Sequence, residues 1–357
     1  MPWLPPRPLL PLDLLADRST SPAITGFTID AATKRAGVLF RPVPQQSISQ
    51  IGLFVQQIVG TPPTCEVRLE TVVNGSPSGA LVAPTARGVF TPQANTWKWV
   101  SLEAPCTPAT GASLAALVAW SAGTVGTTSS ATFALRYPAC FAGQNPSVVQ
   151  YTGTAWSPVA GVLPLVVPRH VDGSLLPGCA AIRGVTWQLL TSTGNPTEVG
   201  NRFVVPFDAS LDALCTCTRL PAGGRANLRL LTETGVTLAS LDSQPLDALV
   251  DLVSTSAAGV MQAPVNSCNV TAGSSCLITQ GALTTGGCHV ARITFADAAS
   301  REALCGPMWW VQRQGTGAWS EDLASVAALS PRVSAVNVSA GAGRSPRHPG
   351  MSGGMVG

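Results

Sequence analysis

Short stretches in which hydrophobic and polar residues alternate recur along this chain, and they predict β-strands. The clearest lies at 65–70, where Cys, Val and Leu alternate with Glu, Arg and Glu, so that one strand face is apolar and the other charged. Comparable strands are expected at 24–30, 37–41, 47–55, 95–102, 115–120 and 132–137. Seven strands within about 115 residues is a density typical of a β-sandwich.

The same three-strand pattern occurs twice in the chain. A strand containing Phe is followed by a strand with an x-Arg-Leu pattern that leads into a turn, and then by a late apolar strand. The first set lies at 37–42, 65–71 and 117–120, and the second at 200–207, 227–235 and 290–295. A spacing of roughly 160 residues is too long for a solenoid repeat and indicates two tandem β-domains, as a duplication would produce.

We therefore expect an all-β protein with two tandem β-sandwich domains and extended termini. The layout places a Pro-rich arm at 1–22, the first sandwich at 23–137 and a connector at 138–180. The second sandwich follows at 181–312, and a C-terminal extension occupies 313–357.

Composition supports this class and excludes several others. Only 11% of the 357 residues are charged, Gly (35) and Pro (30) are abundant, and the one helix-like segment lies at 245–253. A net charge of +3 provides no electrostatic footprint for nucleic acid. No uncharged apolar run reaches the length of about 18 residues needed to cross a membrane. The N-terminus lacks the basic leader of a signal peptide, so we expect synthesis in a cytoplasm.

The ten cysteines do not announce a metal site. C-x-x-C pairs are missing from the sequence, and only Cys288 and His289 place a Cys beside a His. We expect mainly free, buried thiols. The alternatives are one or two disulfides, with Cys268–Cys276 the first choice, or a metal site. No cofactor is expected.

The sequence contains only weak candidates for a set of catalytic residues. His170 and Asp172 are the nearest local pair, but neither a G-x-S-x-G elbow nor an oxyanion loop accompanies them, which favours a surface or linker histidine. Glu66 and Glu70 share a strand face and are a candidate pair of glycosidase carboxylates. We expect that face to be exposed to solvent without a catalytic role. We therefore expect no enzyme activity.

Acidic residues in the second half raise two further alternatives. Asp208 and Asp212 form a second carboxylate pair that chance alone explains. Together with Asp242 they are the candidates for a structural calcium ion, but their spacing is too scattered to define a site.

Tryptophans provide the candidate binding residues. Trp97 and Trp99 lie two positions apart on one expected strand, so both rings project from the same face, with Lys98 on the other. A flat aromatic surface is what a sugar ring packs against. A second pair, Trp309 and Trp310, lies at the end of the second expected sandwich. We expect most of the nine tryptophans to have a core or inter-sheet role, and Trp97 and Trp99 to bind a glycan or a partner protein.

The termini have the composition of extended arms. Five of the first twelve residues are Pro, which disfavours a helix. Trp3, Leu4, Leu9 and Leu10 have no core of their own there, so we expect them to contact an assembly partner; a disordered leader is the alternative. From about 331 the chain is rich in Ser, Gly, Ala and Pro and offers no core either.

Part of the chain resembles jelly-roll domains in structural proteins of tailed bacteriophages. The resemblance rests on IGLFV at 51–55, VRLET at 67–71, GALV at 79–82, NTW at 95–97 and ALVA at 116–119. It covers the first expected sandwich, extends less closely to the second, and includes no catalytic signature. Such galactose-binding-like jelly rolls occur in tail fibres, baseplates and capsid decoration.

The resemblance implies a non-enzymatic virion protein, made in the host cytoplasm and attached to a particle through its termini. Its partners would then be other virion proteins and further copies of the same chain. The alternative is a carbohydrate-binding adhesion module that recognises a host glycan through exposed tryptophans.

Overall fold

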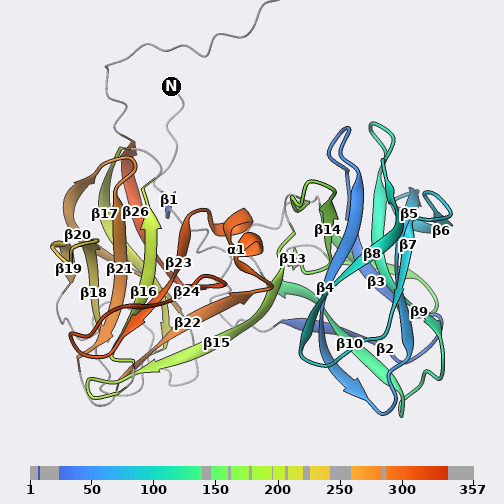
Figure 1. Ribbon diagram of the computed structural model, residues 1–357, viewed down its shortest axis with the longest axis horizontal. Helices are drawn as coiled ribbons and strands as arrows, with labels where there is room; N and C mark the ends of the chain where they lie inside the picture. The colour runs from blue at the N-terminus through green and yellow to red at the C-terminus, as the bar shows by residue number, and fades with distance from the viewer. Residues whose placement is uncertain are drawn as a thin grey trace, which may run out of the picture.

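The computed structural model describes residues 7–8, 24–138, 146–159, 162–176, 179–194, 196–205, 208–219, 226–241, 259–283 and 287–336. In these ranges the chain is almost entirely β-structure arranged in several sheets, which confirms the predicted all-β sandwich class. The strands gather into two bodies that lie side by side, with strands β2 to β14 in one and β15 to β26 in the other (Figure 1). The helix-like segment at 245–253 lies outside the described residues.

The first body contains two sheets. The β3 sheet has the strand order β12-β11-β3-β9-β5-β6, and β7 also pairs with β5. Its strands are β3 (Arg35–Phe40), β5 (Thr64–Val73), β6 (Ser76–Leu81), β7 (Arg87–Phe90), β9 (Leu114–Ala122), β11 (Ser147–Tyr151) and β12 (Trp156–Val159). In the β4 sheet, β4 and β10 are neighbours, β2 and β13 pair with β10, and β8 and β14 pair with β4. The members are β2 (Thr25–Ile29), β4 (Ile48–Val59), β8 (Thr96–Cys106), β10 (Ser130–Pro138), β13 (Val162–Pro164) and β14 (Val167–His170).

The second body also contains two sheets. The β16 sheet has the order β19-β18-β21-β16-β23-β24. Its strands are β16 (Glu198–Val204), β18 (Ala226–Thr232), β19 (Thr237–Leu241), β21 (Ser275–Ala282), β23 (Met308–Arg313) and β24 (Ser320–Asp322). In the β17 sheet the order is β1-β26-β17-β22-β15, with β20 on β17 and β25 on β22. The members are β1 (Arg7–Pro8), β15 (Ile182–Leu190), β17 (Ala209–Arg219), β20 (Gly259–Val270), β22 (Cys288–Phe295), β25 (Ser325–Ala327) and β26 (Leu329–Val336).

The two bodies follow one topology. The order β12-β11-β3-β9-β5-β6 matches β24-β23-β16-β21-β18-β19 strand for strand. In the other sheets β2, β4, β8 and β10 occupy the places of β15, β17, β20 and β22, and β13 and β14 those of β25 and β26. All these pairs follow the same order along the chain. This correspondence is what duplication of one sandwich produces.

The register of the pairing identifies equivalent residues. Gly37 lies opposite Leu117 on β9 and Val149 on β11, and Gly200 lies opposite Thr279 on β21 and Val311 on β23. A Cβ atom on Gly37 would lie 1.9 Å from a neighbouring backbone oxygen, and one on Gly200 would lie 2.1 Å from the equivalent oxygen. Both positions therefore require glycine for the same reason.

One member of the sequence repeat was wrongly assigned. The counterpart of β9 is β21, whereas 290–295 belongs to β22 in the opposite sheet. The apolar pattern misled because β21 carries the buried polar residues Thr279 and Gln280 in its middle. Their hydroxyl and amide groups are hydrogen-bonded inside the protein, so the strand is buried without being uniformly apolar.

The expected connector supplies strands of the first body. Within 138–180, β11 pairs with β3, β13 with β10, and β14 with β4. Likewise, β24, β25 and β26 lie in the expected C-terminal extension and complete the sheets of the second body. The described part of the N-terminal arm, β1, pairs with β26. These segments are therefore parts of the two sandwiches.

Each sandwich has its own core, and the two cores meet. Alternation buries Val67 and Leu69 of β5 in the first core and Val199 and Phe203 of β16 in the second. Leu163, on β13 of the first body, packs into the second core together with Ala134 and Leu165. The two bodies are thus in direct contact.

A short helix, α1 (Ala298–Cys305), lies between β22 and β23. Asp297 caps its N-terminus, accepting a hydrogen bond of 2.7 Å from the backbone nitrogen of Ser300. The sequence analysis did not predict this helix, because eight residues are too few to show a helical period against a background of strands.

Candidate functional site on the outward face of the β16 sheet

An organised set of charged side chains lies on the face of the β16 sheet that points away from the core. Because Val199 and Phe203 enter the core, Glu198 projects outward. The register places Glu198 beside Gly281 of β21 and Arg313 of β23. Strand pairing therefore brings together residues from distant parts of the sequence on one surface.

Glu198 is the centre of this set. Its side chain is buried, and its Oε1 atom accepts hydrogen bonds from Arg229 and, at 2.5 Å, from the hydroxyl of Thr279. Its Oε2 atom accepts from Nε of Arg313 at 2.8 Å and forms an ion pair with Nη2 of the same residue at 2.7 Å. Both oxygens of the carboxylate are occupied, as burial of a charged group requires. Glu198 consequently holds two guanidinium groups in fixed positions.

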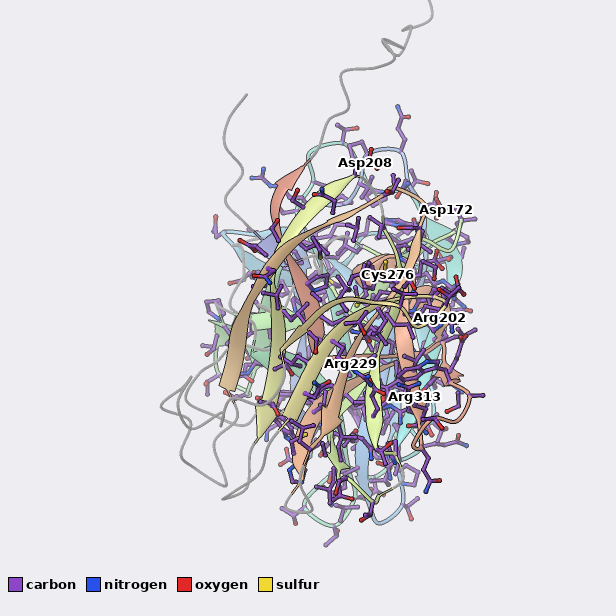
Figure 2. All side chains as sticks on the ribbon, turned by 90° about the vertical axis from the view of Figure 1, so that its left-hand side faces the viewer. Asp172, Arg202, Asp208, Arg229, Cys276 and Arg313 are labelled. Atoms are coloured by element: carbon purple, nitrogen blue, oxygen red, sulfur yellow. The ribbon has the colours of Figure 1, made fainter. Side chains whose placement is uncertain are left out.

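A second charged group lies farther along the same sheet. Arg202 forms ion pairs with Glu321 and with Glu233, the latter at 3.9 Å. The indole nitrogen of Trp309 donates a hydrogen bond of 3.1 Å to Glu321. Arg229 and Arg313 lie near each other on the second body, and Arg202 lies farther along it (Figure 2).

An aromatic ring flanks the site. The guanidinium carbon of Arg313 lies 4.4 Å from the ring centre of Trp319, a cation–π contact. In the first body, Tyr151 and Trp156 occupy the equivalent places, with ring centres 5.2 Å apart. In both sheets a residue at this position contacts a tryptophan. That residue is the neutral Tyr151 in the first body and the charged Arg313 in the second.

A groove lies beside Glu198. Its volume is about 570 Å³, within the range of about 300–1,000 Å³ common for small-ligand sites. The lining combines residues with hydroxyl, amide and charged groups from five strands, β16, β18, β19, β21 and β23. Its residues are Thr197, Glu198, Asn227, Arg229, Thr237, Ser240, Gly281, Ala282, Leu283, Arg313, Gly315 and Thr316.

The groove carries a net positive charge. Two arginines and one glutamate are the charged residues of its lining, so the sum is +1. The side chains of Arg229 and Arg313 are 31% and 20% exposed, so both are partly accessible to solvent. The arrangement can bind a hydroxylated or anionic molecule.

The equivalent face of the first body is charged but balanced. Arg68 pairs with Glu66 at 2.8 Å and with Glu70 at 2.6 Å, and Arg35 pairs with Glu70 at 3.4 Å. Glu66 and Glu70 are both buried, so the expectation of a solvated strand face was wrong. The arginine side chains cover the carboxylates, which alternation along a strand cannot reveal.

Trp97 and Trp99 lie on β8, packed against the first core. Their ring centres are 5.5 Å apart with planes inclined at 64°, and both rings lie over Gly52 of β4. The guanidinium of Arg169 lies 5.0 Å from the ring centre of Trp99. The two rings meet edge to face, and their binding role stays a prediction.

His170 belongs to a turn that stabilises the end of β14. The Ser174 hydroxyl donates to Asp172 at 2.7 Å, so the 3.0 Å contact between Ser174 and Nδ1 of His170 is a hydrogen bond donated by the histidine. The order of partners differs from that of a hydrolase triad, in which the histidine accepts the serine proton. His170 is buried, contrary to the expected surface or linker histidine, and burial lowers its pKa.

Of the remaining sequence candidates, only some lie within the described residues. The carboxylate of Asp208 accepts a backbone hydrogen bond of 2.7 Å from Ala272, while Asp242 lies outside the described residues. No group of three potential metal ligands occurs in the part of the chain that the structure describes. The predicted arm residues lie outside it as well; they are Trp3, Leu4, Leu9 and Leu10.

The seven cysteines with described side chains are free thiols, and six are buried. Cys268 and Cys276, the first choice for a disulfide, are among the seven. Burial raises the pKa of Cys65 and Cys305 to about 12 and that of Cys288 to about 11. These thiols are therefore protonated at neutral pH and poor nucleophiles.

Comparison of the chain with protein-family profiles, curated proteins and solved structures gives no match. Among the described residues, no helix combines the length and apolar character needed to cross a membrane.

Sequence analysis missed the residues around Glu198. Glu198, Arg229 and Arg313 are separated by up to 115 positions, and no local motif links them. A correct alignment of the repeat would have helped, because Thr279 lies between Arg229 and Gly200 just as Leu117 lies between Arg68 and Gly37.

Proposed function

We propose that this protein is a non-enzymatic structural protein of a tailed-bacteriophage virion, assembled with other virion proteins and with further copies of itself. The observation that supports this most is the duplication of one sandwich topology, with the described acidic clusters engaged in ion pairs of the fold. The resemblance of the first sandwich to phage jelly rolls points the same way. Extended termini would attach it to the particle.

Analysis of particles tests this proposal. We expect the protein to be found in purified particles by mass spectrometry and to be placed on a head or tail by electron microscopy. Particles from a strain lacking the gene serve as the control. Consistent absence of the protein from particles that are complete and infectious would contradict the proposal.

A variant tests the role of the arm. Deletion of 1–22 is expected to prevent incorporation, because the anchoring contacts of Trp3, Leu4, Leu9 and Leu10 are lost. Removal of 1–6 alone eliminates Trp3 and Leu4 but keeps Leu9, Leu10 and β1, so it separates the contribution of Trp3 and Leu4 from the pairing of Arg7–Pro8 with β26. Incorporation of the 1–22 deletion at the wild-type level would refute attachment through this arm.

A second candidate function is glycan recognition. The groove beside Glu198 favours it, because its lining of hydroxyl, amide and guanidinium groups is suited to sugar hydroxyls. Binding of a host glycan array by the wild-type protein would support this function. Loss on Trp97→Ala would locate binding at β8, and loss on a groove variant would locate it at the β16 sheet.

A further inference from the structure

We propose that the groove beside Glu198 binds a carboxylate-bearing sugar, such as a uronic acid unit of an acidic polysaccharide. This inference rests on glycan recognition as the function of the site and specifies its ligand. Three features of the groove carry it: its charge, the fixed geometry of its arginines, and the kind of groups around them.

The charge selects an anion. Among the described residues that line the groove, Glu198 is the one acidic residue against two arginines, so this lining has a net charge of +1. A planar guanidinium matches a carboxylate through paired hydrogen bonds.

The geometry is preorganised. Arg313 is held on one side by Glu198 and stacks on the other against Trp319. Arg229 is held by the second oxygen of the same carboxylate. Ligand binding therefore requires little ordering of these long side chains, which reduces the entropic cost of association.

The surroundings indicate a sugar as the carrier of the carboxylate. Exposed hydroxyl groups of Thr237 and Thr316 belong to the same lining as the arginines. Hydroxyl groups exchange hydrogen bonds with the hydroxyls of a pyranose.

Gly281 offers a test that leaves the charged network intact. It lies opposite Glu198 on one side and Asn227 on the other, at the floor of the groove. A Cβ atom there would meet its nearest neighbour at 3.6 Å, an ordinary contact. Gly281→Asp introduces a negative charge, and Gly281→Asn is the neutral control of the same size.

Titration calorimetry on the full-length protein would use tetragalacturonate and its fully methyl-esterified form as probes. We expect the acid to bind at least about tenfold more tightly than the ester, because a charge-assisted contact is lost on esterification. Gly281→Asp should weaken binding of the acid at least about tenfold relative to Gly281→Asn. Unchanged melting temperatures of both variants would show that they are folded.

Each outcome decides a separate claim. Equal binding of acid and ester, or equal affinities of the two Gly281 variants for the acid, would overturn the proposal of an acidic sugar while leaving glycan recognition in place. Binding of neither probe, with no signal on a glycan array, would refute glycan recognition together with this inference. Neither result bears on whether the protein is part of a virion.

Discussion

At the residue scale, the carboxylate of Glu198 joins three strands of the β16 sheet. Replacing Glu198 with Ala leaves Arg229 and Arg313 adjacent and without their shared counter-charge. We expect the free energy of unfolding in urea to fall by about 2–3 kcal/mol, somewhat below the loss for a fully buried pair because the arginines are partly exposed. Glu103→Ala is the control, since its pair with Arg87 is 44–47% exposed and worth less than about 1 kcal/mol. Similar losses in the two variants would contradict the central role of Glu198.

His170 gives the protein an acid-sensitive position. Burial lowers its pKa below the value of about 6.5 in an unfolded chain, so the unfolded state binds the proton more readily. The stability contributed by neutral His170 is complete above about pH 6.5 and is lost as the pH falls through the lowered pKa. Asp172 opposes this effect, and its own pKa is lowered by Ser174, so it stays ionised in this window.

Thermal unfolding between about pH 7.5 and 5 measures this contribution. We expect the melting temperature of the wild-type protein to fall on acidification, and that of His170→Asn to fall less. The amide of Asn can keep the hydrogen bond to Ser174 without taking up a proton. Parallel curves for the two proteins would show that His170 does not titrate in this range.

At 65–70 the sequence predicted the face on which each side chain lies, but not the burial of the charged side chains, and the reason is physical. The alternation at 65–70 correctly separated the buried Cys65, Val67 and Leu69 from the charged positions. It could not show that Glu66 and Glu70 are buried by arginines on the outward face. Alternation identifies the face on which a side chain lies, but neighbouring strands determine what covers it.

At the scale of elements, the close approach of β16 and β21 depends on Gly200. A Cβ atom at this position would lie 2.1 Å from the backbone oxygen of Ile278, which forces the strands apart. We expect Gly200→Ala to lower the free energy of unfolding by about 2 kcal/mol or more, as overpacking of a rigid site does. Gly184→Ala on β15 is the matched control, because a Cβ there meets nothing within 4 Å. If both variants unfold at the same denaturant concentration, the strand spacing is not set by Gly200.

In the first body, several of the strands that sequence missed are very short. The long strands β4, β5, β8 and β10 were predicted within a few residues because each shows several periods of alternation. By contrast, β12, β13 and β14 have three or four residues and contain Pro, so their patterns resemble a linker. Their pairing with strands far away in the sequence, rather than local propensity, makes them strands.

At the scale of the whole molecule, the two sandwiches are complete only with these short strands. A fragment ending at 137 lacks β11, which pairs with β3, and β14, which pairs with β4. A fragment of residues 24–176 keeps all the strands from β2 to β14. Whether the two tandem domains expected from sequence fold separately therefore depends on where the chain is cut.

We expect the 24–176 fragment to give a β-type circular dichroism spectrum and one cooperative melting transition, and the 23–137 fragment to give neither. The larger fragment should melt below the full-length protein, because Ala134, Leu163 and Leu165 lose their packing against the second core. Adding a 179–336 fragment in trans should restore part of that stability if the contact between the cores contributes to folding. Cooperative melting of the 23–137 fragment at the same temperature as 24–176 would show that the segment from β11 to β14 is dispensable, and that the first sandwich ends where the sequence alone had placed its boundary.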